Sequence, residues 1–227
     1  MQPSTHMDEI RRVSKGRAVN ASRAVSTDSL SQSMHLMGAT MAYPRDTEIF
    51  GENEPADYLY KVLSGTVRTY KILRDGRRQV GGFYLPGDIF GLEFADEHTL
   101  SAEAVSDAKV LVVKRSALSA LAARDPSVAQ QLFALTGREL HRVQDRILLL
   151  IKNARERVAS FLLEMAERAS ENNAIELPMS RQDIADYLGL TIETVSRTLS
   201  SLETASAIEV SASSRRIVLR NRAALAA

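Results

Sequence analysis

One stretch near the C-terminus, residues 180–202, restricts the possible fold more than any other part of the chain. It reads SRQDIADYLGLTIETVSRTLSSL. Ser180 and Thr191 are favourable N-cap residues, and Gly189 suits the left-handed conformation that ends a helix. The stretch therefore predicts two short helices joined by a tight turn, which is a helix-turn-helix.

The second of these helices carries the candidate functional residues. In a helix-turn-helix unit, the second helix enters the DNA major groove, and its N-terminal half faces the base edges. We expect Ile192, Val195 and Leu199 to hold this helix to its domain. The polar residues that remain on or near its outer side are Glu193, Thr194, Ser196, Arg197 and Ser200. Arginine can pair with guanine and glutamate can accept from cytosine, so these residue types can read bases.

Charge leaves a second interpretation open. Residues 180–227 contain six arginines and five carboxylates, which is not a strongly basic patch. A helical hairpin that serves as an interaction surface in an all-α domain fits the same pattern. The order of caps, turn and polar face favours DNA binding. Because the whole chain has 29 basic and 28 acidic residues, any DNA-binding surface must come from local placement.

Composition excludes several classes of site. The chain has no cysteine, which excludes disulfides, thiolate-bound iron–sulfur clusters and cysteine-based zinc sites. No apolar run approaches the roughly 20 residues of a membrane span, so we expect a cytoplasmic protein without a membrane partner. The acidic and histidine residues that lie close in sequence match no metal-ligand or nucleophile pattern, and we expect no enzyme; they are Glu93, Glu97, His98 and Glu103.

The N-terminal half divides into two regions. Residues 1–35 are polar with scattered basic side chains and are expected to form a mobile tail, which could contact nucleic acid or a membrane but is more commonly just solvated. Residues 36–122 show short apolar runs separated by turns, of which Asp75-Gly76 is typical of a hairpin. This spacing predicts an all-β sandwich or small barrel. Its loop 87–93 suits either a phosphate-binding cradle or a tight turn that closes the barrel, and we favour the turn.

The second half is predominantly helical. Residues 123–153 show apolar residues three or four apart, and they either pack within one chain or form a dimerisation helix. The candidate dimerisation residues are Leu132, Leu140, Val143, Ile147 and Leu150. Residues 154–227 predict a further helix after a bend near Asn153, a short strand, the helix-turn-helix and a β-hairpin, which together form a winged helix-turn-helix. Arg215 and Arg216, at the hairpin tip, are equally compatible with phosphate contact and with simple solvation.

In this order, the parts resemble the Crp/Fnr family of bacterial transcription regulators along almost the whole chain after the tail. The sequence LPGDIFG resembles the cyclic-nucleotide-binding-like domain, and DIADYLGLTIETVSRTLSSLE resembles the helix-turn-helix. The pattern of Glu193, Ser196 and Arg197 is similar to that of the FixK-type branch. The resemblance implies an α+β fold with an N-terminal cyclic-nucleotide-binding-like β-barrel (jelly roll), a long dimerisation helix and a C-terminal winged helix-turn-helix.

The resemblance also implies a function. It implies a homodimeric activator that contacts RNA polymerase and binds double-stranded DNA at a palindrome like TTGAT-N4-ATCAA. Glu193, Ser196 and Arg197 would then contact bases. The residues expected to contact the DNA backbone or to support the base contacts are Ser180, Thr191, Thr194, Ser200, Arg215 and Arg216.

Departures from the family pattern bear on what is sensed. A cyclic AMP receptor has Gly-Glu and Arg-Ser pairs, whereas Gly91-Leu92 and Leu100-Ser101 stand here, so the arginine that neutralises a cyclic phosphate is lacking. Candidate haem ligands are His6, His35, His98 and His141, but a lone histidine is more often structural. We therefore expect a regulator with no bound effector or cofactor. The alternative is an effector-gated sensor whose barrel binds a cyclic nucleotide or haem.

Overall fold

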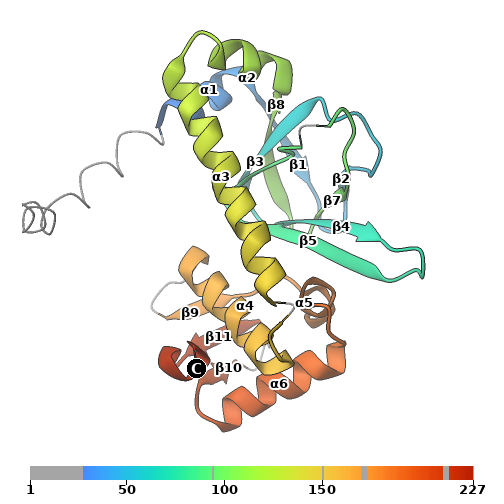
Figure 1. Cartoon of the computed structure of the whole chain (residues 1–227), viewed down its shortest axis with the longest axis vertical. Coiled ribbons are helices and arrows are strands. Elements are labelled where there is room, and N and C mark those ends of the chain that lie inside the picture. The colour runs from blue at the N-terminus through green and yellow to red at the C-terminus, as the bar shows by residue number, and fades with distance from the viewer. Residues whose placement is uncertain (1–27, 94, 150, 170–172, 212–214, 227) are drawn as a thin grey trace, which may run out of the picture.

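The computed structural model describes residues 28–93, 95–149, 151–169, 173–211 and 215–226. A β-barrel lies on one side of a long helix, and a small helical domain with a three-stranded sheet lies beyond its end (Figure 1). The expected α+β fold class is confirmed. The expected tail differs in part, because α1 (Asp28–Met37) begins within it and buries Leu30 and Met34 against the barrel, while residues 1–27 lie outside the described residues.

Two four-stranded antiparallel sheets form the barrel. One has the order β1 (Ala39–Tyr43), β8 (Ala108–Lys114), β3 (Tyr58–Ser64) and β6 (Ile89–Phe90). The other has the order β2 (Glu48–Phe50), β7 (Ser101–Ala104), β4 (Val67–Ile72) and β5 (Arg78–Tyr84). The predicted Asp75-Gly76 turn joins β4 to β5, where Gly76 adopts φ 80°. The barrel is thus closed by local turns and filled by its inward-facing side chains.

Three helices follow the barrel: α2 (Arg115–Ala122), α3 (Pro126–Leu149) and α4 (Ala154–Ala169). Pro126 occupies the first turn of α3, where its missing amide hydrogen costs no helical hydrogen bond. The predicted bend near Asn153 is confirmed, because Asn153 Oδ1 accepts from Glu156 N (3.0 Å) and Glu156 Oε2 accepts from Asn153 N (2.9 Å). This reciprocal pair starts α4 as a new helix.

The remaining elements form the winged helix-turn-helix that the sequence predicted. They are β9 (Ala174–Glu176), α5 (Arg181–Leu188), α6 (Ile192–Thr204), β10 (Ile208–Val210), β11 (Arg216–Leu219) and α7 (Arg222–Ala226). The three strands form an antiparallel sheet in the order β10-β11-β9. The C-terminal domain therefore presents α5 and α6 beside a small wing.

One apolar core continues from the barrel into the C-terminal domain. Val80 and Phe83 on β5 belong to the same buried cluster as Phe161 on α4 and Tyr187 on α5. The Phe83 ring lies 6.2 Å from that of Phe161 and 5.3 Å from that of Tyr187, between ring centroids. Such pairs favour tilted contacts and add to the gain from area burial. The C-terminal domain is therefore packed onto the outer face of β5.

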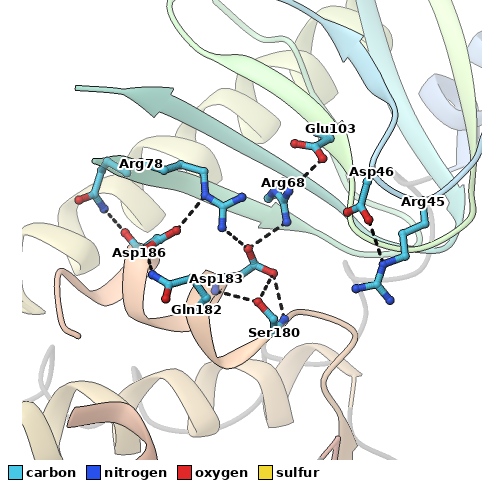
Figure 2. Close-up of polar contacts among 10 residues, drawn as sticks. Arg45, Asp46, Arg68, Arg78, Glu103, Ser180, Gln182, Asp183 and Asp186 are labelled. Atoms are coloured by element: carbon cyan, nitrogen blue, oxygen red, sulfur yellow. Dashed lines mark hydrogen bonds and ion pairs between the residues drawn. The ribbon is translucent and has the colours of Figure 1, made fainter. Parts of the chain in front are cut away.

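Charged side chains flank this shared core and form what we term the interdomain ion cluster (Figure 2). Its members are Arg68, Arg78 and Glu103 from the barrel and Asp183 and Asp186 from α5. Arg68 donates to Glu103 (3.0 Å) and to Asp183 (2.9 Å). Arg78 donates to Asp183 (2.5 Å) and to Asp186 (2.8 Å). Since the Arg68 and Asp183 side chains are only 8% and 5% exposed, these charges depend on one another for solvation.

The shared core yields a stability prediction. Phe161→Ala should lower the free energy of unfolding by about 3–5 kcal/mol, because Phe161 is 1% exposed and its loss leaves a cavity between the domains. The measurement is urea unfolding at one fixed protein concentration. Leu36→Ala is the control; Leu36 is 88% exposed, and the change should stay within about 0.5 kcal/mol of wild type. Equal losses in the two variants would contradict the prediction.

Candidate nucleic-acid interface

A reciprocal cap starts α5, the first helix of the helix-turn-helix. Ser180 Oγ accepts from Asp183 N (3.1 Å), and Asp183 Oδ2 accepts from Ser180 N (2.9 Å) and Ser180 Oγ (2.8 Å). The predicted N-cap is therefore confirmed, with the acidic side chain also complementing the positive helix end. Ser180 thus supports the site by fixing where α5 begins.

The turn into α6 also has the predicted geometry. Gly189 adopts φ 64° in the left-handed region, and Thr191 Oγ1 accepts from Thr194 N (3.2 Å). Val195 and Leu199 are buried and hold α6 to the domain, as expected. The expectation for Ile192 was wrong, since it is 37% exposed. It is the first residue of α6 and lines a groove beside the β4–β5 hairpin instead of the core.

Polar side chains share one exposed face of α6. The set with helical spacing is Glu193, Ser196, Arg197 and Ser200. Glu193 and Arg197 are exposed, while Ser196 is half-buried and accepts from Arg181 Nη1 (3.3 Å). Hydrogen bonds from the Glu193 amide and the Thr191 hydroxyl, with the charge of Arg197, hold the pKa of the Glu193 carboxyl below its ordinary value. Near neutral pH, this face therefore offers a carboxylate, a guanidinium and two hydroxyls.

Two further arginines lie beside this face that sequence reasoning had not singled out. Arg181 on α5 donates to Ser196, and Arg155 on α4 donates to Ser201 Oγ (3.0 Å). The position of Arg181 directly after an N-cap was a usable signal. Arg155 is 46 residues from Ser201, and nothing in the local sequence relates the two. Folding thus gathers arginines from three helices on a domain of nearly neutral charge.

The wing arginines lie elsewhere. Arg215 and Arg216 are exposed and line a cleft together with Gly65 and Thr66 of the barrel. No residue of α6 lines this cleft. Residues 212–214, at the centre of the expected hairpin tip, lie outside the described residues. Phosphate contact by Arg215 and Arg216 therefore stays a prediction.

The candidate dimerisation residues differ in how exposed they are. Leu140, Val143 and Ile147 are 59%, 46% and 59% exposed on α3. Leu132 is half-buried and packs against the buried cluster that contains Leu118 in its own chain, so its part in a dimer stays a prediction, and Leu150 lies outside the described residues.

Sequence reasoning also missed part of the exposed apolar face of α3. Phe133 is 82% exposed and Ile151, just beyond the helix, is 85% exposed. Phe133, Leu140 and Ile147 recur every seven residues, which is the spacing of a helix seam that packs against another helix.

The loop expected as either a phosphate cradle or a closing turn is bound to its own chain. Asp88 accepts from Leu85 N (2.8 Å), from Arg168 on α4 (2.6 Å) and from Arg142 on α3 (3.0 Å). Ser101, the expected counterpart of the phosphate-binding serine, accepts from Glu52 N (2.9 Å). These contacts favour the closing-turn interpretation.

Aromatic rings fill the barrel interior. The His98 ring stacks on Phe50 with 3.6 Å between centroids, and the Tyr60 ring stacks on Phe90 at 5.1 Å. His98 is 1% exposed, and its Nδ1 lies 3.4 Å from Glu93 Oε1. The other described candidate haem ligands, His35 and His141, are exposed on helices. Of the acidic and histidine residues that lie close in sequence, only Glu93 and His98 form a pair.

Two other kinds of feature, a metal site and a membrane-spanning helix, are absent from the described residues. No group of three or more histidine, aspartate or glutamate side chains is placed to hold a metal ion there. Among the described helices, none is both long and apolar enough to cross a membrane.

Comparisons with known proteins agree with this architecture. Residues 156–227 match the Crp-like helix-turn-helix domain, and residues 40–125 match the cyclic nucleotide-binding domain. The nitrogen fixation regulation protein FixK of Azorhizobium caulinodans is 51% identical over 195 residues, which cover 83% of this chain and 78% of that protein. FixK of Rhizobium meliloti is 40% identical over 182 residues, covering 77% and 83%. The solved structure of FixK2 from Bradyrhizobium japonicum has a TM-score of 0.80 and 53% identity, covering 83% of this chain and 96% of that one.

The turn between α5 and α6 yields a second prediction. Gly189→Ala should lower the free energy of unfolding by about 1–2 kcal/mol, because a Cβ is disfavoured at a left-handed φ. Crowding would not explain the loss, since the nearest atom to an added Cβ is Arg157 Nη1 at 3.8 Å. Gly189→Asn is the matched control and should lose less than half as much, because asparagine tolerates this conformation. Chemical denaturation measures both, and a larger loss in the asparagine variant would refute the strain argument.

Proposed function

Since this chain belongs to the Crp/Fnr family of transcription regulators and is a FixK-type member, we propose that it binds a palindromic DNA site as a homodimer without a bound effector. The proposed site resembles TTGAT-N4-ATCAA. The observation that carries the proposal is the exposed polar face of α6, which the capped α5 and the Gly189 turn present as one rigid unit.

The α6 face supplies the groups for base reading. Arg197 is exposed and has the two-pronged donor geometry that pairs with guanine O6 and N7. The Glu193 carboxylate is positioned to accept from a cytosine amino group. Ser196 is held beside them by Arg181, whose charge then lies next to the DNA backbone. In this arrangement Thr194 and Ser200 support the contacts from either end of the face.

A second copy of the chain is the proposed occupant of the apolar face of α3. The face continues for more than two heptads through Phe133, Leu140 and Ile147, all of which are exposed in the single chain. Burying such a seam against an identical helix removes apolar area from water and gives two-fold symmetry. A two-fold dimer presents two α6 helices to successive major grooves, which requires a palindromic site.

Several observations support binding without an effector. The barrel interior is filled by stacked rings, and Asp88 and Ser101 form contacts within the chain. The position of the family's phosphate-binding arginine is Leu100. A buried cyclic phosphate would therefore lack its strongest partner.

The proposed role in the cell follows from the family. A FixK-type regulator would act in the cytoplasm as a transcription activator and contact RNA polymerase. No catalytic step is proposed, since the similar FixK proteins are named as regulators.

Replacement of Arg197 tests the base contact. Arg197→Ala should weaken binding to the TTGAT-N4-ATCAA duplex by about 1–3 kcal/mol and relax the preference at one base pair. Fluorescence anisotropy at fixed salt without ligand measures this, using the consensus duplex and duplexes changed at single positions. Arg222→Ala, an exposed arginine at the start of α7, is the control and should keep the preference. If Arg197→Ala bound consensus and scrambled duplexes as wild type does, the assigned role would be wrong.

Replacement on α3 tests the dimer. Leu140→Glu should convert the dimer into a monomer, because it places like charges at the centre of the proposed seam, and binding to the full palindrome should fall at least about tenfold. Analytical ultracentrifugation gives the mass in solution. Arg124→Glu, which adds a negative charge at the turn before α3, should remain dimeric. A Leu140→Glu variant that stayed dimeric would exclude this face as the interface.

A further inference from the structure

The interdomain ion cluster uses the two oxygens of Asp183 for different purposes. Oδ2 accepts from the Ser180 amide and hydroxyl and so caps α5. Oδ1 accepts from Arg68 on β4 and Arg78 on β5. One buried carboxylate therefore defines the start of α5 and also attaches that helix to the barrel.

Other contacts restrict how α5 can rotate on the barrel. Arg78 Nε donates to Asp186 Oδ2 (2.8 Å), one helical turn after Asp183, and Gln79 Nε2 donates to the Asp186 carbonyl (2.6 Å). Figure 2 shows the arginines reaching down from the sheet to the two carboxylates along α5. Two attachment points along the helix axis oppose tilting as well as sliding.

The barrel is itself attached to α3. Arg146 Nη2 donates to the Val80 carbonyl on β5 (2.9 Å), and Arg142 binds Asp88 (3.0 Å). A continuous path of contacts thus joins the proposed dimer helix to α5 through the barrel. This path does not pass through the segment between α3 and α4.

The position of α6 follows from that of α5. Ile184 and Leu188 of α5 and Val195 and Leu199 of α6 belong to the same buried cluster. The two helices should therefore move as one unit. Another angle between the domains would separate Asp183 from Arg68 and Arg78 and leave its buried carboxylate without a cationic partner, which is strongly unfavourable. The cluster therefore selects one orientation of α6 relative to α3.

That orientation matters for DNA spacing. In a two-fold dimer, the separation and angle of the two α6 helices must match the two half-sites. One inserted base pair moves a half-site by about 3.4 Å along the duplex and turns it by about 35° around the axis. A rigid attachment tolerates such changes poorly, and a loose one tolerates them better.

We propose that Arg68 and Arg78 are positioning residues that set the half-site spacing the dimer accepts. The proposal rests on the proposed function, because it takes the dimer and the palindrome as given. The proposal goes beyond that function, because it assigns the choice of half-site spacing to side chains of the barrel that do not contact DNA. Through ion pairs within the chain, the cluster then holds the DNA-binding domain permanently in one orientation.

Binding of duplexes with different spacers tests the proposal. The duplexes keep the TTGAT and ATCAA half-sites and separate them by three, four or five base pairs. Wild type should prefer the four-base-pair spacer, and Arg78→Gln should reduce the ratio of its affinities for the four- and five-base-pair spacers by about fivefold. A partly unfolded variant would lose affinity for all duplexes equally, so this ratio separates positioning from general loss of stability.

Matched variants sharpen the comparison. Arg77→Gln removes a neighbouring arginine whose side chain is 77% exposed and pairs with Asp75 of the same turn, so its spacer ratio should equal that of wild type. Asp186→Asn neutralises one of the two carboxylates that Arg78 binds in the opposite domain while keeping the side-chain shape, and should lower the ratio as Arg78→Gln does. It also serves if Arg78→Gln does not fold.

Spin labels test the attachment without DNA. Since the chain has no cysteine, Ile72→Cys on the barrel and Ala205→Cys after α6 place nitroxides at two unique exposed sites. Labelled chains are diluted with unlabelled chains, and pulsed electron paramagnetic resonance gives the distance distribution within one chain. It should be narrow with Arg78 present and broader in Arg78→Gln.

The outcomes are distinguishable. An unchanged distance distribution in Arg78→Gln overturns the proposal whatever DNA the protein binds. A broader distribution with an unchanged spacer ratio overturns the assignment of spacing selectivity. If wild type bound no palindrome of any spacing, the proposed function would fail, and the spin-label result would still decide whether Arg78 positions the domain.

Discussion

The arrangement of this protein depends on the contact between strand β5 and helices α4 and α5. The C-terminal domain is small, and its core residues Phe161 and Tyr187 extend their packing to Phe83 on the barrel. Apolar burial drives the association, but it is not directional. The interdomain ion cluster beside it adds direction, because hydrogen-bonded ion pairs require defined geometry. Together they place α6 at one end of the molecule (Figure 1).

The barrel loop that would hold a ligand phosphate in a cyclic-nucleotide receptor has a structural use here. Asp88 forms ion pairs with Arg142 on α3 and Arg168 on α4, so the loop joins the barrel to both helices. Gly91 is needed for the same close packing, since it adopts φ 79° and an added Cβ would lie 2.9 Å from the Tyr60 ring. The contacts of Asp88 thus lie within the chain, which supports the proposal of a regulator without a bound effector.

The positions of the charged side chains on the C-terminal domain say more about DNA binding than its net charge does. Its net charge is close to zero, and several of its carboxylates are directed away from the α6 face. Asp183 and Asp186 pair with barrel arginines, and Glu209 pairs with Arg220 on the wing. Arg155, Arg181 and Arg197 remain near the α6 face. A modest number of phosphate contacts implies weak non-specific binding, so discrimination should rest on the base contacts.

The sequence by itself determined the local elements, because their causes lie within a few residues. The Ser180 cap, the Gly189 and Asp75-Gly76 turns and the α3–α4 bend all follow from neighbouring residues, and all are present. Only the tertiary structure decided which side of α3 faces the chain, so that Leu132 is packed while Phe133 is exposed. It also decided the pairing of Arg68 with Asp183, 115 residues apart, and of Arg155 with Ser201. Such contacts depend on how whole elements pack. No local pattern in the sequence encodes which distant side chain will bind a given charged group.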